Sequence, residues 1–190
     1  RDREVGGRCG EGVGARGAWC QVVWLGGGVA VVLGHGMLAQ APAYTYQRVM
    51  SPVRDGVKLE TVIVAPANAK GPLPILFRRT PYDVPANANF VTGAAFKDFV
   101  QDGYIFVVQN LRGRFGSEGV FELSMKADLE NPKATSETTD AYDSIDWLVK
   151  TVANNSGKVG IYGVSYDGIT AGVTLLQPHP ALKAVSEQAS

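Results

Sequence analysis

Apolar residues fall into short β-prone runs and one longer helical stripe. The runs at residues 46–50, 57–64, 73–79, 104–108, 158–162 and 182–185 are typical of strands. Arg54-Asp55-Gly56 lies between the first two runs and favours a tight turn, so these strands are expected to form a hairpin. Residues 104–108 make up the most β-prone run and predict a central strand.

Three segments between the strands fit helices. The clearest is residues 136–152, which carries an apolar stripe at helical spacing and two acidic residues, Glu137 and Asp140, in its first turn. Residues 96–103 predict a short helix that ends at a glycine, and residues 166–176 predict a third. Strands that alternate with helices predict an α/β fold with a mostly parallel sheet, and the hairpin would be its antiparallel edge.

Ser165 stands in the sequence Gly-Val-Ser-Tyr-Asp-Gly, residues 163–168, which resembles Gly-x-Ser-x-Gly with the second glycine one position late. A strand before it and a helix after it form the context that a nucleophile elbow needs. Gly163 has no Cβ to clash in so tight a turn, and the Tyr166 N–H would lie at a helix N-terminus, aimed at an oxyanion. The alternative is an ordinary serine in a glycine-rich turn.

The first 43 residues differ from the rest and predict a leader. Residues 1–17 are rich in glycine and arginine, and residues 22–38 are apolar. Ala41-Pro42-Ala43 follows as a cleavage site, so the pattern favours a signal peptide and a secreted or periplasmic protein. A membrane anchor is the alternative, but the apolar run is short and glycine-rich. Residues 44–190 would then form the mature part.

Composition and motif spacing argue against several classes of partner and cofactor. Eighteen basic and eighteen acidic residues balance, so nothing indicates nucleic acid or an anionic membrane as a partner. Residues 12–17 match Gly-x-Gly-x-x-Gly, yet no strand precedes them, which argues against a dinucleotide site. Cys9 and Cys20 both precede the expected cleavage site, and no residues have metal-ligand spacing, so no cofactor or metal is expected.

Several segments together resemble a serine hydrolase family that contains cocaine esterase, the α-amino acid ester hydrolases, glutaryl acylases and X-Pro dipeptidyl-peptidases. They are VMSPVRDGVKL, RRTPYD, LRGRFGSEG, SETTDAYDSIDWL, GVSYDG and LLQPHPALKA. The likeness runs from about Tyr46 to the end of the chain and is strongest to the α-amino acid ester hydrolases. One departure is Asn110, where the family usually has aspartate.

The resemblance implies an α/β-hydrolase domain of which this chain is the N-terminal part, without the cap, the jelly-roll domain and the triad Asp and His. In such folds the acid and then the histidine follow the serine. His179 is the only later histidine, and it lies 14 positions on in a proline-flanked turn. We therefore expect the chain by itself to be inactive.

Tyr82 is implied as the second oxyanion donor, through its phenol. Its loop would leave the carboxyl end of a strand, at the edge that carries Ser165. A phenol has a pKa of about 10 and stays protonated at neutral pH. The alternative is a tyrosine that only packs in a Thr-Pro-Tyr turn.

Other charged residues are expected to have structural roles. Arg112, Arg114 and Glu118 favour an ion-pair network in their loop. Asp140, Asp143 and Asp146 favour a solvated helix face.

The leading hypothesis is a secreted serine hydrolase or acyltransferase with Ser165 as nucleophile. Its substrates would be small esters or amides, such as α-amino acid esters or β-lactam acyl groups, with no stable membrane partner after cleavage. The alternatives are an X-Pro dipeptidyl-peptidase-type peptidase and a truncated, non-catalytic α/β domain. The acyl preference and the oligomeric state, including a homo-oligomer, are left open.

Overall fold

The computed structural model describes residues 20–25, 28–33, 43–123, 127–128, 130–131 and 133–190, and divides into two units, Arg1–Ala41 and Pro42–Ser190. In the first unit, β1 (Cys20–Leu25) pairs antiparallel with β2 (Gly28–Leu33). Residues 1–19, 26–27 and 34–42, which make up most of the expected leader and of its cleavage site, lie outside the described residues. Within the described part, no helix is long and apolar enough to cross a membrane.

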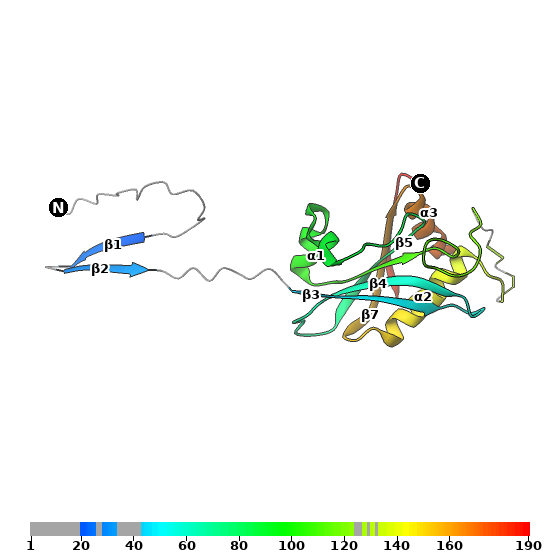
Figure 1. Ribbon diagram of the computed structural model, residues 1–190, viewed down its shortest axis with the longest axis horizontal. Coiled ribbons are helices and arrows are strands. Elements are labelled where there is room, and N and C mark those ends of the chain that lie inside the picture. The colour runs from blue at the N-terminus through cyan, green and yellow to red at the C-terminus, as the bar shows by residue number, and fades with distance from the viewer. Residues whose placement is uncertain (1–19, 26–27, 34–42, 124–126, 129, 132) are drawn as a thin grey trace. The chain divides into compact units, whose positions relative to one another are not determined.

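The second unit is built on a six-stranded sheet (Figure 1). Its strands are β3 (Tyr44–Pro52), β4 (Lys58–Pro66), β5 (Leu73–Thr80), β6 (Ile105–Asn110), β7 (Asn155–Val164) and β8 (Leu182–Gln188). They lie in the order β3-β4-β6-β5-β7-β8. The pairs β3–β4 and β4–β6 are antiparallel, and the other three pairs are parallel. The predicted parallel sheet with an antiparallel hairpin at its edge is confirmed.

The hairpin forms where the turn residues predict it. Gly56 has a φ of 87°, a conformation that glycine adopts without a Cβ penalty. The turn is closed by hydrogen bonds between the backbones of Val53 and Val57, and of Gly56 and Val53.

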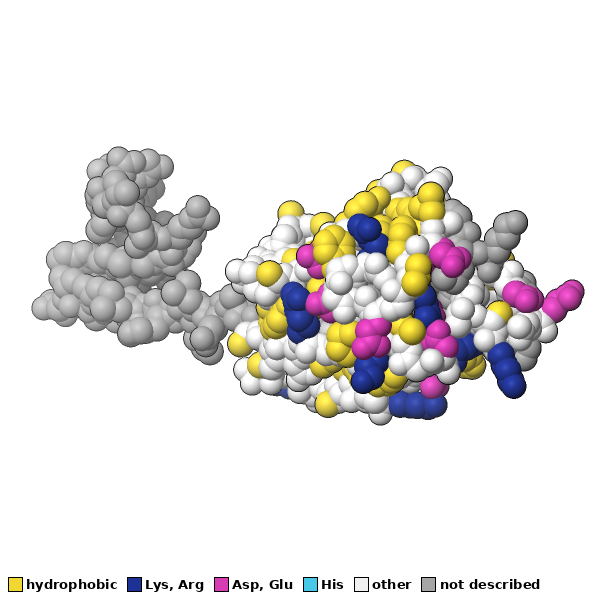
Figure 2. All heavy atoms as spheres, turned by 45° about the vertical axis from the view of Figure 1, so that its right-hand side comes forward, with side chains coloured by type: hydrophobic (Ala, Val, Ile, Leu, Met, Phe, Trp, Pro, Cys, Tyr) yellow, Lys and Arg dark blue, Asp and Glu magenta, His cyan; other side chains and the backbone are white. Residues whose placement is uncertain are grey.

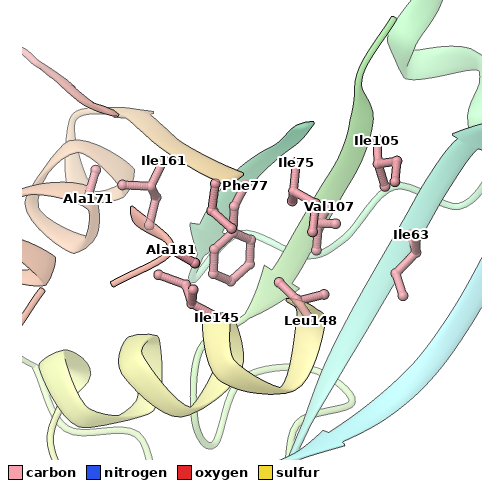
Figure 3. Packing of buried hydrophobic residues seen from close by; sticks show 11 residues of the cluster. Ile63, Ile75, Phe77, Ile105, Val107, Ile145, Leu148, Ile161, Ala171 and Ala181 are labelled. Carbon is pink, nitrogen blue, oxygen red and sulfur yellow. The ribbon is translucent and has the colours of Figure 1, made fainter. Parts of the chain in front are cut away.

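Helix α2 (Glu137–Thr151) covers one face of the sheet. It begins with a capping box in which Ser136 and Thr139 bond each other's backbone N–H. Figure 3 shows Ile145 and Leu148 of α2 pointing toward Phe77 and Val107 of the sheet. Because these four side chains are almost fully buried, they form the centre of this core.

The opposite face is covered by the segment between β5 and β6. That segment contains the 3₁₀ turns Ala88–Thr92 and Ala94–Phe96 and helix α1 (Lys97–Asp102), which ends at Gly103 as predicted. Phe96 packs edge-on against Phe106 of β6 and Tyr162 of β7. The sheet is therefore covered on both faces, as a largely parallel sheet requires.

The helix predicted over residues 166–176 is shorter than expected. Helix α3 (Tyr166–Gly172) stops after seven residues and continues as a 3₁₀ turn, Val173–Leu176. Glycines at 168 and 172 and β-branched residues at 173 and 174 are poor helix formers, which explains the early end. Helix α3 is tied to β5, since the Thr170 hydroxyl donates to the Arg79 carbonyl at 2.9 Å.

Candidate active site

Ser165 occupies a strained turn between β7 and α3. Its φ of 58° and ψ of −127° lie in a region that residues other than glycine rarely adopt. The turn is held by two hydrogen bonds, from the Ser165 N–H to the Gln188 carbonyl and from the Ile169 N–H to the Ser165 carbonyl. Ser165 is nevertheless exposed to solvent. The predicted strand–turn–helix context is therefore confirmed, and the catalytic role of Ser165 stays a prediction.

The two glycines of the elbow are needed for close packing. A Cβ on Gly163 would overlap the carbonyl of Asp167, so β7 and α3 could not approach as they do. A Cβ on Gly168 would lie 2.9 Å from the Gln188 carbonyl oxygen at the end of β8. The second glycine thus comes one position late because residue 168, rather than 167, faces the neighbouring strand.

Asp167 occupies the position where Gly-x-Ser-x-Gly would have its second glycine. Its side chain is buried, and Arg78 approaches it at 3.7 Å. Burial raises the pKa of the Asp167 carboxyl above its usual range.

Tyr166 follows the serine as the first residue of α3. Its backbone N–H belongs to the first turn of the helix, where N–H groups have no acceptor within the helix. Its ring lies 6.3 Å from the ring of Phe121, measured between centroids. An N–H at this position fits the predicted oxyanion donor, and the role of Tyr166 stays a prediction.

Tyr82 lies two residues beyond the end of β5. Because β5 and β7 are parallel neighbours, the Tyr82 loop and Ser165 leave the sheet at the same edge. The Tyr82 residue is 63% exposed, and its phenol makes no hydrogen bond to any residue that the structure describes. The ring is therefore not packed in the turn, as the alternative expected, and the oxyanion role of the phenol stays a prediction.

The loop of Tyr82 is fixed from the β6 side. The Leu111 N–H donates to the Thr80 carbonyl at 3.0 Å, and Arg114 Nε donates to the Pro81 carbonyl at 3.0 Å. The Tyr82 N–H itself donates to the Thr80 hydroxyl at 3.2 Å. The backbone at Tyr82 is thus restrained although its side chain is exposed.

The expectation of an ion-pair network in the 110–119 loop is correct for Arg112. Its guanidinium binds Asp140 and Asp55, each at 2.7 Å. Glu118 instead accepts a hydrogen bond from the Lys58 N–H. Arg114 pairs with no carboxylate among the described residues, but its guanidinium lies 5.2 Å from the ring centres of Phe115 and Phe121. Sequence reasoning did not single out Phe121, because its contacts follow no local spacing.

The prediction of a solvated face for Asp140, Asp143 and Asp146 is wrong for Asp140. Asp140 is fully buried because Arg112 reaches over the start of α2 to pair with it. Asp143 pairs with Arg54, and Asp146 pairs with Lys150 on an exposed helix face. Figure 2 shows basic and acidic side chains close together on one face of the molecule, in keeping with the balanced charge.

Asn110, which departs from the family pattern, has a clear structural role. Its Nδ2 donates to Glu60 Oε2 at 2.6 Å and approaches Asp83 Oδ1 at 3.4 Å. Glu60 is buried and also accepts the Gly116 N–H. An aspartate at position 110 would face two carboxylates here, so the amide suits this environment.

His179 cannot serve Ser165 in this fold. It lies in the turn before β8, where Nδ1 accepts the Ala181 N–H and Nε2 lies 3.4 Å from Asp146. His179 precedes the amino end of β8, whereas Ser165 follows the carboxyl end of β7, and the two strands are parallel. A strand of seven residues separates these ends of the sheet by roughly 20 Å. Within the described ranges, no cluster of three or more His, Cys, Asp or Glu residues could hold a metal.

A cavity of about 540 Å³ opens at the amino ends of the parallel strands, opposite the carboxyl ends that carry Ser165 and Tyr82. Its lining includes Leu73, Ile105, Trp147 and Asn154, near the amino ends of β5, β6 and β7. None of the three predicted site residues lines it, so it is separate from the candidate active site.

Comparison with known proteins identifies relatives of this chain. Residues 55–190 match the family model described as X-Pro dipeptidyl-peptidase (S15 family). Cocaine esterase from Rhodococcus sp. (strain MB1 Bresler) is 37% identical over 139 residues, which are 73% of this chain and 22% of the relative.

Two solved structures are similar in fold and in sequence. An α-amino acid ester hydrolase is 44% identical with a TM-score of 0.68, over 76% of this chain and 25% of that one. An aminopeptidase from a marine sediment archaeon, Thaumarchaeota archaeon, is 36% identical with a TM-score of 0.68, over 78% of this chain and 26% of that one. This chain thus spans about a quarter of the length of these proteins.

Proposed function

The chain belongs to the X-Pro dipeptidyl-peptidase (S15) family of hydrolases and has the α/β-hydrolase fold, and on this premise we propose that it carries the nucleophile of a serine hydrolase. The observation that carries the proposal is Ser165, which is exposed and strained at the turn between β7 and α3. Strain at a solvent-facing serine has no evident structural benefit, and it is a feature of nucleophile elbows.

In the proposed reaction the Ser165 hydroxyl oxygen attacks the carbonyl carbon of an ester or amide. A histidine base takes the hydroxyl proton and then gives it to the departing alcohol or amine, which leaves an acyl-enzyme. Water attacks the acyl-enzyme with the same base and releases the acid, and an amine in place of water would give acyl transfer. The histidine and its acidic partner would come from a part of the protein that the structure does not describe.

The Tyr166 N–H and the Tyr82 phenol would stabilise the oxyanion that forms in each step. Tyr166 supplies an N–H at the start of α3, and Tyr82, in the loop after β5, has a phenol without a hydrogen-bond partner among the described residues. Donors that are already oriented cost no reorganisation when charge develops, which is why such groups contribute strongly to catalysis.

Esters of α-amino acids, and amides such as β-lactam acyl groups, are the substrates we propose. Support comes from the 44% identity to an α-amino acid ester hydrolase and the 37% identity to cocaine esterase. A peptidase is the second candidate, because an archaeal aminopeptidase is 36% identical with the same TM-score. Comparing the hydrolysis of an amino-acid ester with that of a proline-containing peptide separates the two candidates.

A fluorophosphonate probe tests the nucleophile directly. We expect it to label an active preparation of the protein that contains this chain, and to leave the Ser165→Ala variant unlabelled. Ser156→Ala is a matched control, since Ser156 lies near the amino end of β7. Labelling that persists in Ser165→Ala would show that another residue is the nucleophile.

A further inference from the structure

Arg114 is held by contacts that differ from those of the other arginines in its region. Its guanidinium carbon lies over the Phe115 ring and over the Phe121 ring, 5.2 Å from each ring centre. Its Nε donates to the Pro81 carbonyl oxygen at 3.0 Å. Arg112, two positions earlier, is instead buried between two carboxylates.

These contacts connect the loop of Tyr82 to the elbow of Ser165. Pro81, whose carbonyl Arg114 holds, immediately precedes Tyr82. Phe121, against which the same guanidinium lies, has its ring 6.3 Å from the ring of Tyr166. Arg114 and Phe121 together therefore link the two segments that carry the proposed oxyanion donors.

Two further restraints on the Tyr82 loop act at Thr80, and a third acts at Asp83, which Asn110 Nδ2 approaches at 3.4 Å. The Leu111 N–H holds the Thr80 carbonyl, and the Tyr82 N–H bonds the Thr80 hydroxyl, so both act through Thr80. Arg114 binds one peptide further on, at the unit that leads into Tyr82. Because the Tyr82 ring is largely exposed, its direction depends on how well this peptide is fixed.

Arginine suits this position for a physical reason. A planar guanidinium can stack on aromatic faces while its N–H groups donate in the plane, and an ammonium cannot do both in the same way. A purely electrostatic role would be expected to bring a carboxylate within reach, and none of the described residues supplies one to Arg114.

We propose that Arg114 is a positioning residue that fixes the Pro81–Tyr82 loop against the elbow, so that the Tyr82 phenol and the Tyr166 N–H converge on one oxyanion. The inference rests on the proposed function, because it assigns Arg114 a role through those two donors. Small displacements of catalytic groups are costly, and an error of about 1 Å can reduce the rate about 100-fold.

A double-mutant cycle with Tyr82→Phe tests this role in an active preparation of the protein. Arg114→Ala should lower kcat about 10- to 100-fold with KM within about threefold, since positioning acts in the transition state. In the Tyr82→Phe background, the same substitution should cost less than about threefold, because the phenol that it positions is already gone. Arg114→Lys should resemble Arg114→Ala, since charge alone does not restore the stacked donor.

Hydrogen exchange of the Tyr82 amide gives a readout that is independent of turnover. It should be faster in Arg114→Ala than in the wild type, because the neighbouring peptide has lost its restraint. Arg54→Ala is the matched control, since Arg54 binds Asp143 on the outer side of α2 and should change neither kcat nor this exchange. If Arg114→Ala does not fold, Phe121→Leu removes the ring between Arg114 and Tyr166 and should also lower kcat.

Two results would overturn the inference. One is an unchanged kcat in a folded Arg114→Ala enzyme, and the other is an equal loss of kcat in the wild-type and Tyr82→Phe backgrounds. Failure of the proposed function looks different, because Ser165→Ala would then keep its activity whatever the Arg114 variants do.

Discussion

The candidate active site and the ion pairs of Arg112 contrast in how their polar groups are satisfied. Ser165 and Tyr82 are exposed at the carboxyl edge of the sheet, and the Tyr82 phenol has no partner among the described residues. Arg112 is buried and bonds two carboxylates through three of its nitrogens. The guanidinium of Arg112 is thus saturated with partners inside the fold, whereas the side chains proposed for chemistry are open to solvent.

Ser165→Ala should have the largest effect on activity and almost none on stability. We expect turnover in an active preparation to fall on the order of 10⁶-fold, because the nucleophile is lost. The melting temperature should change little, since the side chain is exposed and the backbone bonds of the turn remain. Steady-state kinetics and thermal melts of the same preparation measure both, and a variant that keeps a tenth of its turnover would break the contrast.

Arg112→Met should have the opposite effect. It leaves Asp140 fully buried without its cation, which we expect to cost about 3–5 kcal/mol of unfolding free energy. The kcat of the folded enzyme should stay within about threefold, since Arg112 bonds Asp140 and Asp55 and neither proposed donor. Denaturant unfolding measures the stability, and a large loss of kcat with normal stability would contradict the division of roles.

Tyr82→Phe tests whether the exposed phenol belongs to the active site. If the phenol stabilises an oxyanion, kcat should fall about 10²–10³-fold, equivalent to about 3–4 kcal/mol. KM should change little, because the bond strengthens mainly in the transition state. The assay is ester hydrolysis, with the melting temperature as the control for folding. A folded variant within threefold of wild-type kcat would leave Tyr82 as a surface tyrosine.

Asp55→Asn should give the smallest effect, and its sign depends on pH. The hydrogen bond from Arg112 lowers the pKa of the Asp55 carboxyl. A lowered folded-state pKa stabilises the protein above the unfolded pKa of about 4, and this contribution is lost as the pH falls through the folded value. The wild type should therefore have a higher melting temperature than Asp55→Asn at pH 6, and this difference in melting temperature should shrink toward pH 3. A difference in melting temperature that grows as the pH falls would contradict the lowered pKa of Asp55.

Local sequence patterns were sufficient to predict the elements that position the candidate active site. Turn residues at 54–56, the apolar stripe of α2 and the glycine-rich sequence at 163–168 predicted the hairpin, the helix and the elbow. Each of these depends on residues within a few positions of one another, so the information lies in short stretches of sequence. The resemblance to a hydrolase family added Tyr82, which no local pattern would have selected.

Tertiary structure decided which polar groups are free and which are paired. Asp140 seemed equivalent to Asp143 on the helix, yet it is buried because Arg112, 28 positions earlier, folds onto it. Arg114 likewise resembles its neighbour in sequence, and only the fold places it between Phe121 and the carbonyl of Pro81. Such contacts join residues whose separation follows no period, because the order of the strands in the sheet brings them together. The sequence by itself therefore determined where the elbow stands, and packing determined what surrounds it.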